Sequence, residues 1–137
     1  MSDFVWPIRV YYEDTDAVGV VYHTNYIKFM ERARTEALRD KGIEQPQLKQ
    51  LHNIVFAIRK ISVDYLKPAY FNDLLNITVR MTKLGKASLV MAQQVLRESE
   101  ILCQGTVKIG VINVINQRPH SMPFDIFQKL KSMNSEL

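Results

Sequence analysis

The sequence has little cysteine and no long apolar run, and these absences exclude several kinds of protein. Cys103 is the only cysteine among 137 residues, so an intramolecular disulfide and a cysteine-rich zinc module are both impossible. The longest stretch without Asp, Glu, Lys or Arg is residues 17–27, much shorter than the about 20 apolar residues of a membrane-spanning helix. The first residues include Asp3 and lack the basic and apolar segments of a signal peptide. We therefore expect a cytoplasmic protein without a transmembrane segment.

Signatures of metal, phosphate-loop and nucleic-acid binding are also missing. The histidines, His23, His52 and His120, are scattered without a paired spacing, so no metal site is expected. No glycine-rich loop of the P-loop or Rossmann type occurs. Lys and Arg number 18 and Asp and Glu number 14, which gives a net charge of +4. Because this charge is spread along the chain, it argues against nucleic-acid binding and permits an anionic small molecule or an acidic protein partner.

Hydrophobic periodicity predicts one long helix among several strands. Tyr26, Phe29 and Met30 begin an apolar stripe at helical spacing with charged residues between them. Gly42 stands where this amphipathic helix is expected to end. Apolar and polar residues alternate in further segments, which predicts strands over residues 8–12, 54–66, 75–82, 86–97 and 103–111.

The order of strand, long helix and then four strands indicates one α+β domain over residues 1–137. The helix must bury its apolar stripe, and the economical arrangement is a five-stranded antiparallel sheet wrapped around it. Polar residues 44–53, which include Pro46, are expected to form a loop or a broken helical turn, and residues 124–133 a short helix. Long strands leave edges that invite pairing with another copy, so we expect a homo-oligomer.

The segment most informative about function is residues 12–26, YEDTDAVGVVYHTNY. It places three carboxylates and a glycine turn before the long helix, and Tyr22 and His23 at the helix entry. A carboxylate here can act as a general base or nucleophile, and unpaired N–H groups of the first helical turn can bind an oxyanion. Asp and Thr before a helix are also ordinary capping and turn residues. The residues alone therefore leave a catalytic and a structural interpretation open.

This segment resembles the signature of the hotdog-fold thioesterases of the 4-hydroxybenzoyl-CoA thioesterase family. It is most similar to the small acyl-CoA thioesterases encoded with the bacterial Tol–Pal cell-envelope system. The similarity extends along nearly the whole chain and includes residues 30–34 and 64–69 and Asp73 before the next strand. One departure is Asn72, where a Gly commonly precedes the Asp, and Asn tolerates the positive φ of a turn. The resemblance implies the hotdog fold, in which a five-stranded antiparallel sheet wraps a long central helix.

The resemblance also implies hydrolysis of an acyl-CoA thioester and assigns roles to the matching residues. Asp16 is the catalytic carboxylate, either as a nucleophile that forms a mixed anhydride or as the base that activates water. His23 supplies the oxyanion donor through its backbone N–H, and Gly19 allows the tight approach. The His23 side chain is implicated as a hydrogen-bond partner or acid for the departing thiolate, and Tyr22 shapes the site. No cofactor is expected besides the CoA that forms part of the substrate.

Active sites of this family lie between two subunits, so a second part of the fold is expected to contribute to substrate binding. The candidate substrate-binding residues are Tyr65, Pro68, Lys86, Ser88, Arg59 and Arg97, the two arginines being available to the CoA phosphates. The expected assembly is a homodimer or a dimer of dimers, that is, a homotetramer, in the cytoplasm or peripherally at the inner membrane. Cys103 lies on the apolar face of a strand and is expected to be a buried structural thiol.

Two other functions compete with hydrolysis of acyl-CoA. A hotdog dehydratase acting on acyl carrier protein places its His and its acid differently from Asp16 and His23. A scaffold that binds acyl carrier protein or envelope-biogenesis partners, with weak hydrolysis, suits the basic net charge and is kept as the alternative.

Overall fold

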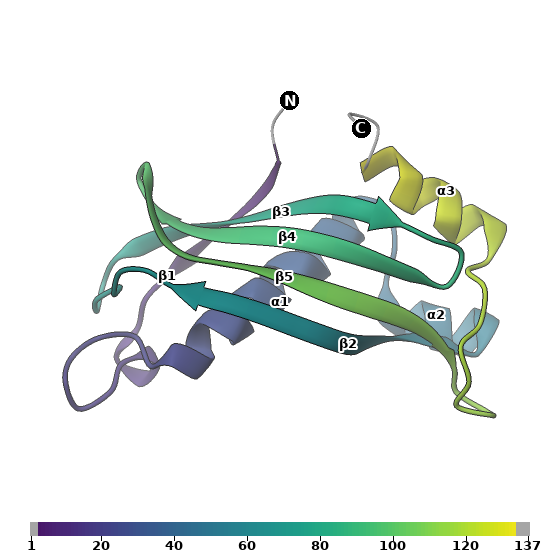
Figure 1. The fold of residues 1–137 in the computed structure, drawn as a ribbon, viewed down its shortest axis with the longest axis horizontal. Helices are drawn as coiled ribbons and strands as arrows, with labels where there is room; N and C mark the ends of the chain where they lie inside the picture. Colours follow the sequence, from purple (N-terminus) through teal and green to yellow (C-terminus); the bar gives the residue numbers. More distant parts are fainter. Residues whose placement is uncertain (1–2, 134–137) are drawn as a thin grey trace.

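The computed structural model describes residues 3–133, and Figure 1 shows how their elements are arranged. In chain order these are β1 (Phe4–Arg9), the short 3-10 turn η1 (Tyr12–Asp14), α1 (His23–Asp40), α2 (Gln45–His52), β2 (Ile54–Tyr65), β3 (Leu74–Leu84), β4 (Ser88–Arg97), β5 (Glu100–Asn113) and α3 (Phe124–Met133). The predicted α+β order of one strand, one long helix and four strands is confirmed.

The strands form one five-stranded antiparallel sheet in the order β1-β3-β4-β5-β2. β3, β4 and β5 follow one another along the chain and pair as successive hairpins, whereas β1 and β2 form the two edges. α1 runs behind the sheet and packs against β1, β3 and β4 (Figure 1). β2 is 12 residues long and pairs only with β5 in the described part of the chain. One long strand edge is therefore open.

Alternation along the strands decides which side chains meet α1. Ile77, Val79 and Met81 on β3 are buried and lie two residues apart, so they share one face of the pleat. Phe29 and Ala33, one turn apart on α1, belong to the same core. Full burial of a large apolar side chain stabilises a fold by about 1.5–3 kcal/mol. The match between the helix stripe and the strand faces therefore fixes α1 on the sheet.

The position predicted for β1 is wrong. The alternation predicts a strand over residues 8–12, but the strand is Phe4–Arg9 and contains Pro7. Proline has no N–H to donate and often marks a strand boundary, but an edge strand bonds a neighbour on one side only. Among residues 3–133, β1 pairs only with β3, so Pro7 is tolerated. Tyr12 belongs instead to the 3-10 turn that follows.

The polar segment expected as a loop or a broken turn forms the complete eight-residue helix α2. Pro46 lies in its first turn, where the missing N–H would have no partner within the helix. Leu48 is buried in the core. Asn53, with a φ of 57°, ends the helix in the left-handed conformation. Pro46 is therefore compatible with the start of a helix here, whereas the sequence pattern predicts a loop or a broken turn around it.

A buried polar link joins α1 to β4. Arg34, only 7% exposed, donates from Nη1 to Oε1 of Gln93 at 2.9 Å. The Nε2 of Gln93 donates to the backbone oxygen of Met30 at 3.0 Å. Burial lowers the pKa of Arg34, because the guanidinium loses hydration there. Gln93 thus connects two points, one turn apart on α1, to the middle of the sheet.

The Gln93→Leu variant should leave the buried guanidinium of Arg34 without its acceptor and lower the free energy of unfolding by about 2 kcal/mol. The double variant Arg34→Met/Gln93→Leu removes both polar groups and should be more stable than Gln93→Leu alone. Urea unfolding at a single protein concentration measures both changes. Equal stability of Gln93→Leu and the unmodified chain would show that the link contributes nothing.

Candidate active site

Asp16 lies in a tight loop immediately before α1. Its N–H donates to the oxygen of Val20 at 2.9 Å, and the N–H of Gly19 donates to the oxygen of Asp16 at 3.0 Å. Gly19 has a φ of +94°, which side chains disfavour, so glycine lets the loop turn this tightly. The Oδ1 of Asp16 accepts the N–H of Val18 at 2.9 Å, and Oδ2 accepts no hydrogen bond from residues 3–133. The exposed carboxylate is thus oriented through one oxygen, while the other is free for chemistry.

The helix α1 begins at His23 without a side-chain cap. Its N-cap residue, Tyr22, makes no side-chain hydrogen bond to the helix end, and the N–H of Asn25 donates to the oxygen of Tyr22 at 2.8 Å. The N–H groups of His23 and Thr24 find no acceptor within residues 3–133. Unpaired N–H groups at the positive end of a helix dipole favour a negatively charged oxygen. A carboxylate and an open helix terminus therefore adjoin in one short segment.

The His23 ring lies beside two tyrosine rings. Its centroid is 4.5 Å from that of Tyr22 and 6.1 Å from that of Tyr65. The hydroxyl of Tyr65 donates to the backbone oxygen of His23 at 3.1 Å, which ties the end of β2 to the first turn of α1. From the sequence, Tyr65 is expected in the half-site contributed by a second subunit. Here it contacts His23 of its own chain.

The loop between β2 and β3 runs alongside the segment that precedes α1. The N–H of Val21 donates to the oxygen of Ala69 at 2.9 Å, and Val20 forms an antiparallel bridge with Tyr70. The N–H of Ala69 donates to the buried hydroxyl of Tyr26 at 2.9 Å. Burial raises the pKa of Tyr26, so this hydroxyl stays protonated at neutral pH. The loop is therefore bonded both to the segment before α1 and to α1 itself.

Pro68 and Arg97 lie beside the same loop. The Nη1 of Arg97 donates to the backbone oxygen of Pro68 at 3.3 Å and to Oδ2 of Asp73 at 2.8 Å. Arg97 is expected from the sequence near the substrate, but its pairing with Asp73 is not predicted there. No local pattern carries that signal, because Asp73 lies in the loop before β3 and Arg97 at the end of β4, and only the folding of the whole sheet brings them together.

Lys86, Ser88 and Arg59 lie away from this group within one chain. Val95 is the residue of β4 that lies at the same position along the sheet as Tyr65. β4 begins at Ser88, nearer the opposite end of the sheet. Ser88 and Val95 are therefore about 23 Å apart along β4, at about 3.3 Å per residue. Lys86 precedes β4 at the same far end, and Arg59 lies at the bulge in the middle of β2. A site that used both ends of the sheet would need a second chain.

Cys103 is buried, as the sequence predicts. Burial raises the pKa of its thiol to about 12. The thiol is therefore protonated at neutral pH, and a protonated thiol is a poor nucleophile. This environment fits a structural residue.

No metal centre or membrane helix is found in the part of the chain that the structure describes. No three His, Cys, Asp or Glu side chains there lie close enough to hold a metal ion. None of the helices within residues 3–133 combines the length and the apolar character needed to cross a membrane.

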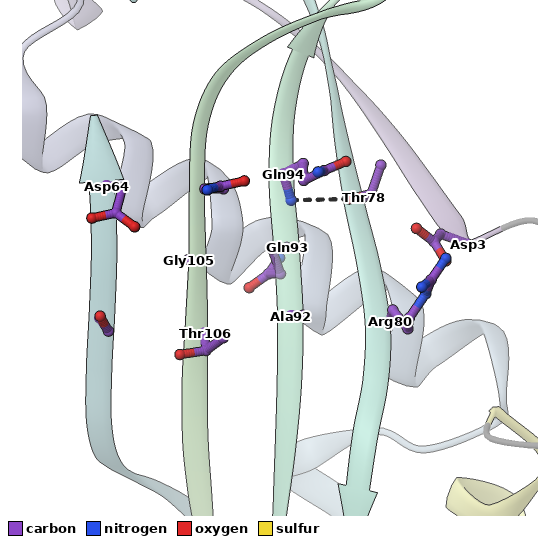
Figure 2. A pocket seen from close by; sticks show the side chains of 11 residues that line it. Asp3, Asp64, Thr78, Arg80, Ala92, Gln93, Gln94, Gly105 and Thr106 are labelled. Atoms are coloured by element: carbon purple, nitrogen blue, oxygen red, sulfur yellow. Dashed lines mark hydrogen bonds and ion pairs between the residues drawn. The ribbon is translucent and has the colours of Figure 1, made fainter. Parts of the chain in front are cut away.

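A hollow of about 330 Å³ lies on the face of the sheet turned away from α1 (Figure 2). Its lining is mostly polar and includes Asp64, Thr78 and Gln94. At one end Arg80 and Asp3 form an ion pair of 2.7 Å. No residue of the segment 12–26 lines this hollow, so it is separate from the Asp16 loop.

The long helix laid across one antiparallel sheet, with the open helix terminus at one end, is the hotdog fold of thioesterases. A family model described as "Thioesterase superfamily" matches residues 18–104, and the chain belongs to this superfamily. The matched segment begins at residue 18, so it does not include Asp16.

Individual relatives agree with this family. "Acyl-CoA thioester hydrolase YbgC" of Escherichia coli O6:H1 is 40% identical over 129 residues, which cover 93% of this chain and 96% of that protein. "Acyl-CoA thioesterase YbgC" of Haemophilus influenzae is 36% identical over 125 residues, 91% of this chain and 92% of that protein. The crystal structure of a probable thioesterase from Bartonella henselae superposes with a TM-score of 0.84 at 34% identity, covering 89% of this chain and 100% of that chain.

The Tyr26→Phe variant removes the acceptor of the buried Ala69 N–H and should lower the free energy of unfolding by about 1–3 kcal/mol. Tyr65→Phe is the matched control, because it removes a hydroxyl from an exposed residue and should change stability by less than about 0.5 kcal/mol. Urea unfolding followed by circular dichroism compares the two. Equal losses in both variants would contradict the argument from burial.

Proposed function

We propose that this chain hydrolyses the thioester of an acyl-CoA to the free acid and CoA. Relatives that are 36% and 40% identical over most of the chain are named acyl-CoA thioesterases, which supports this class of reaction. The observation that carries the proposal is that Asp16, which has one carboxylate oxygen without a hydrogen bond from residues 3–133, lies in the loop that leads directly into the uncapped first turn of α1. This pairing supplies a nucleophile or base and a stabiliser of negative charge.

In the proposed reaction the thioester carbonyl oxygen lies at the first turn of α1, where the N–H of His23 stabilises its developing negative charge. Asp16 either attacks the carbonyl carbon, giving a mixed anhydride and the CoA thiolate, or takes a proton from the attacking water. In the first route water then opens the anhydride, so both routes yield the same acid and thiol. The His23 side chain, flanked by Tyr22, offers a hydrogen bond or a proton to the departing sulfur.

The proposed site is completed by a second copy of the chain. The open strand β2 carries Ile58 and Ile61, which are 48% and 39% exposed, and an edge of this length and apolar character favours pairing. Two β2 strands that pair antiparallel about a two-fold axis bring the Ser88 end of one sheet to the Tyr65 end of the other. Ser88 and Lys86 would then line the acyl-CoA site of the neighbouring copy. A homotetramer would join two such dimers.

The CoA phosphates are proposed to meet Arg59 and Lys86. Neither residue forms an ion pair with residues 3–133, so both cations are available to an anion. Arg59 lies on the open strand β2, and Lys86 lies at the sheet end that the two-fold pairing brings to the site. Exposed cations of this kind attract a polyanionic nucleotide by long-range steering.

The cytoplasmic location, peripheral association with the inner membrane, a link to the Tol–Pal system and the scaffold role stay predictions from the sequence. The net charge of +4 suits an acidic carrier protein. No feature of the described residues favours that role over hydrolysis. Binding of acyl carrier protein by a variant that has lost hydrolysis would support a separate scaffold function.

The Asp16→Asn variant should lower kcat for acyl-CoA hydrolysis by about 10²-fold or more, because an amide is neither a base nor a nucleophile. Asn keeps the oxygen that accepts the N–H of Val18, so thermal unfolding should change little. Glu13→Gln is the matched control, since it neutralises an exposed carboxylate in the same segment and should keep kcat. His23→Ala should lower kcat strongly while it lowers thermal stability only slightly. Release of free thiol from a panel of acetyl- to palmitoyl-CoA and benzoyl-CoA measures all three.

Either of two results would contradict these roles. Near-normal hydrolysis by Asp16→Asn across the panel would remove Asp16 from the reaction. Parallel losses of stability and turnover in His23→Ala would give that histidine a structural role.

Mixing two inactive variants tests whether the site is shared between subunits. Asp16→Asn should complement Lys86→Glu/Ser88→Tyr, because a heterodimer of the two contains one intact site. After subunit exchange at equal amounts, about a quarter of the activity should return. Light scattering should give at least twice the chain mass of 15.9 kDa. A monomeric mass, or no recovery in mixtures that form heterodimers, would refute the shared site.

A further inference from the structure

Arg97, the last residue of β4, is the centre of a cluster of charged groups beside the Asp16 loop. Its Nη1 bonds Asp73 and the Pro68 carbonyl, and its Nη2 donates to Oε1 of Glu100 at 2.7 Å. The hydrogen bond to Asp73, more than the others, raises the pKa of Arg97. Two carboxylates and a carbonyl thus occupy both ends of the guanidinium fork.

Most of these contacts hold one loop, residues 68–73. The Oδ2 of Asp73 accepts the N–H of Tyr70 at 2.9 Å in addition to the bond from Arg97. The guanidinium lies over the Tyr70 ring, 5.8 Å from its centroid. Asn72 adopts the expected positive φ, 72°, and its N–H donates to the oxygen of Val10 at 2.9 Å. Arg97 therefore fixes this loop at both its first and its last residue.

The same loop reaches the segment that carries the reacting groups. Ala69 accepts the N–H of Val21, and Val21 lies two residues before His23, where α1 begins. A shift of the loop therefore moves the helix terminus relative to Asp16. Catalytic geometry is sensitive to such shifts, because a displacement of about 1 Å can cost about 10²-fold in rate.

We propose that Arg97 is a positioning residue, which acts through the loop of residues 68–73 on the alignment of Asp16 with the first turn of α1. The inference rests on the proposed hydrolysis at Asp16. It replaces the phosphate-binding role assigned to Arg97 from the sequence, because a guanidinium paired with two carboxylates offers little net charge to a phosphate. Lysine cannot take over this role, since one ammonium group does not reproduce a planar fork that spans several acceptors.

Two substrates separate positioning from phosphate binding: an acyl-CoA, and the matching acyl-pantetheine, which keeps the thioester and lacks the phosphates. Arg97→Lys should lower kcat about tenfold on both substrates, since misalignment affects the thioester itself. Asp73→Asn should do the same, and the double variant should lose no more than Arg97→Lys alone, because both act through one contact. A raised KM for acyl-CoA with normal turnover of acyl-pantetheine would overturn the proposal.

Arg80→Lys is the matched control, because Arg80 also pairs with a carboxylate, Asp3 at 2.7 Å, but faces the outer hollow. It should keep normal kcat on both substrates. Hydrogen exchange of the Val21 and Ala69 amides should quicken in Arg97→Lys and not in Arg80→Lys. Unchanged exchange, or faster exchange throughout the chain, would overturn the positioning role. This readout needs no turnover, so it is separable from a failure of the proposed hydrolysis, which would appear as no activity in the unmodified chain.

Discussion

A backbone hydrogen bond of 2.9 Å from Val21 to Ala69 joins the chain just before α1 to the loop after β2. On one side of this bond α1 begins, and on the other side Ala69 is held by the buried hydroxyl of Tyr26. The N–H groups of a first helical turn stabilise an oxyanion only when their direction is fixed beforehand. This bond and its supports hold the start of α1 beside the Asp16 loop, so the proposed chemistry would depend on packing that lies outside the proposed reacting groups.

The segment before α1 leaves the start of the helix without a side-chain cap, which costs stability. A side-chain cap contributes about 1 kcal/mol to a helix, and three suitable side chains precede α1. Asp14, Thr15 and Asp16 all bond backbone groups within their own loop, and none caps the helix. The turn-forming interpretation of these residues and the catalytic one are therefore compatible, because the bonds that shape the loop leave the N–H groups of His23 and Thr24 open.

Elements with strong periodicity were predictable from the sequence, and contacts between elements were not. The stripe of α1 and the alternation of β2 to β5 place these elements to within a few residues. Pro46 favoured a loop or a broken turn in the sequence pattern, whereas a first helical turn tolerates proline; the alternation at residues 8–12 placed the first strand too far along the chain. The contacts of Tyr65 with His23 and of Arg97 with the β2–β3 loop depend on sheet register, which no single segment specifies. The site motif was visible because its residues are contiguous.

The most direct test of this account is a crystal structure with a ketone analogue of an acyl-CoA, in which a methylene group replaces the thioester sulfur and prevents hydrolysis. The carbonyl oxygen should accept the N–H of His23, and a carboxylate oxygen of Asp16 should face the carbonyl carbon. A carbonyl bound away from the first turn of α1, for example in the hollow on the outer face of the sheet, would contradict this account.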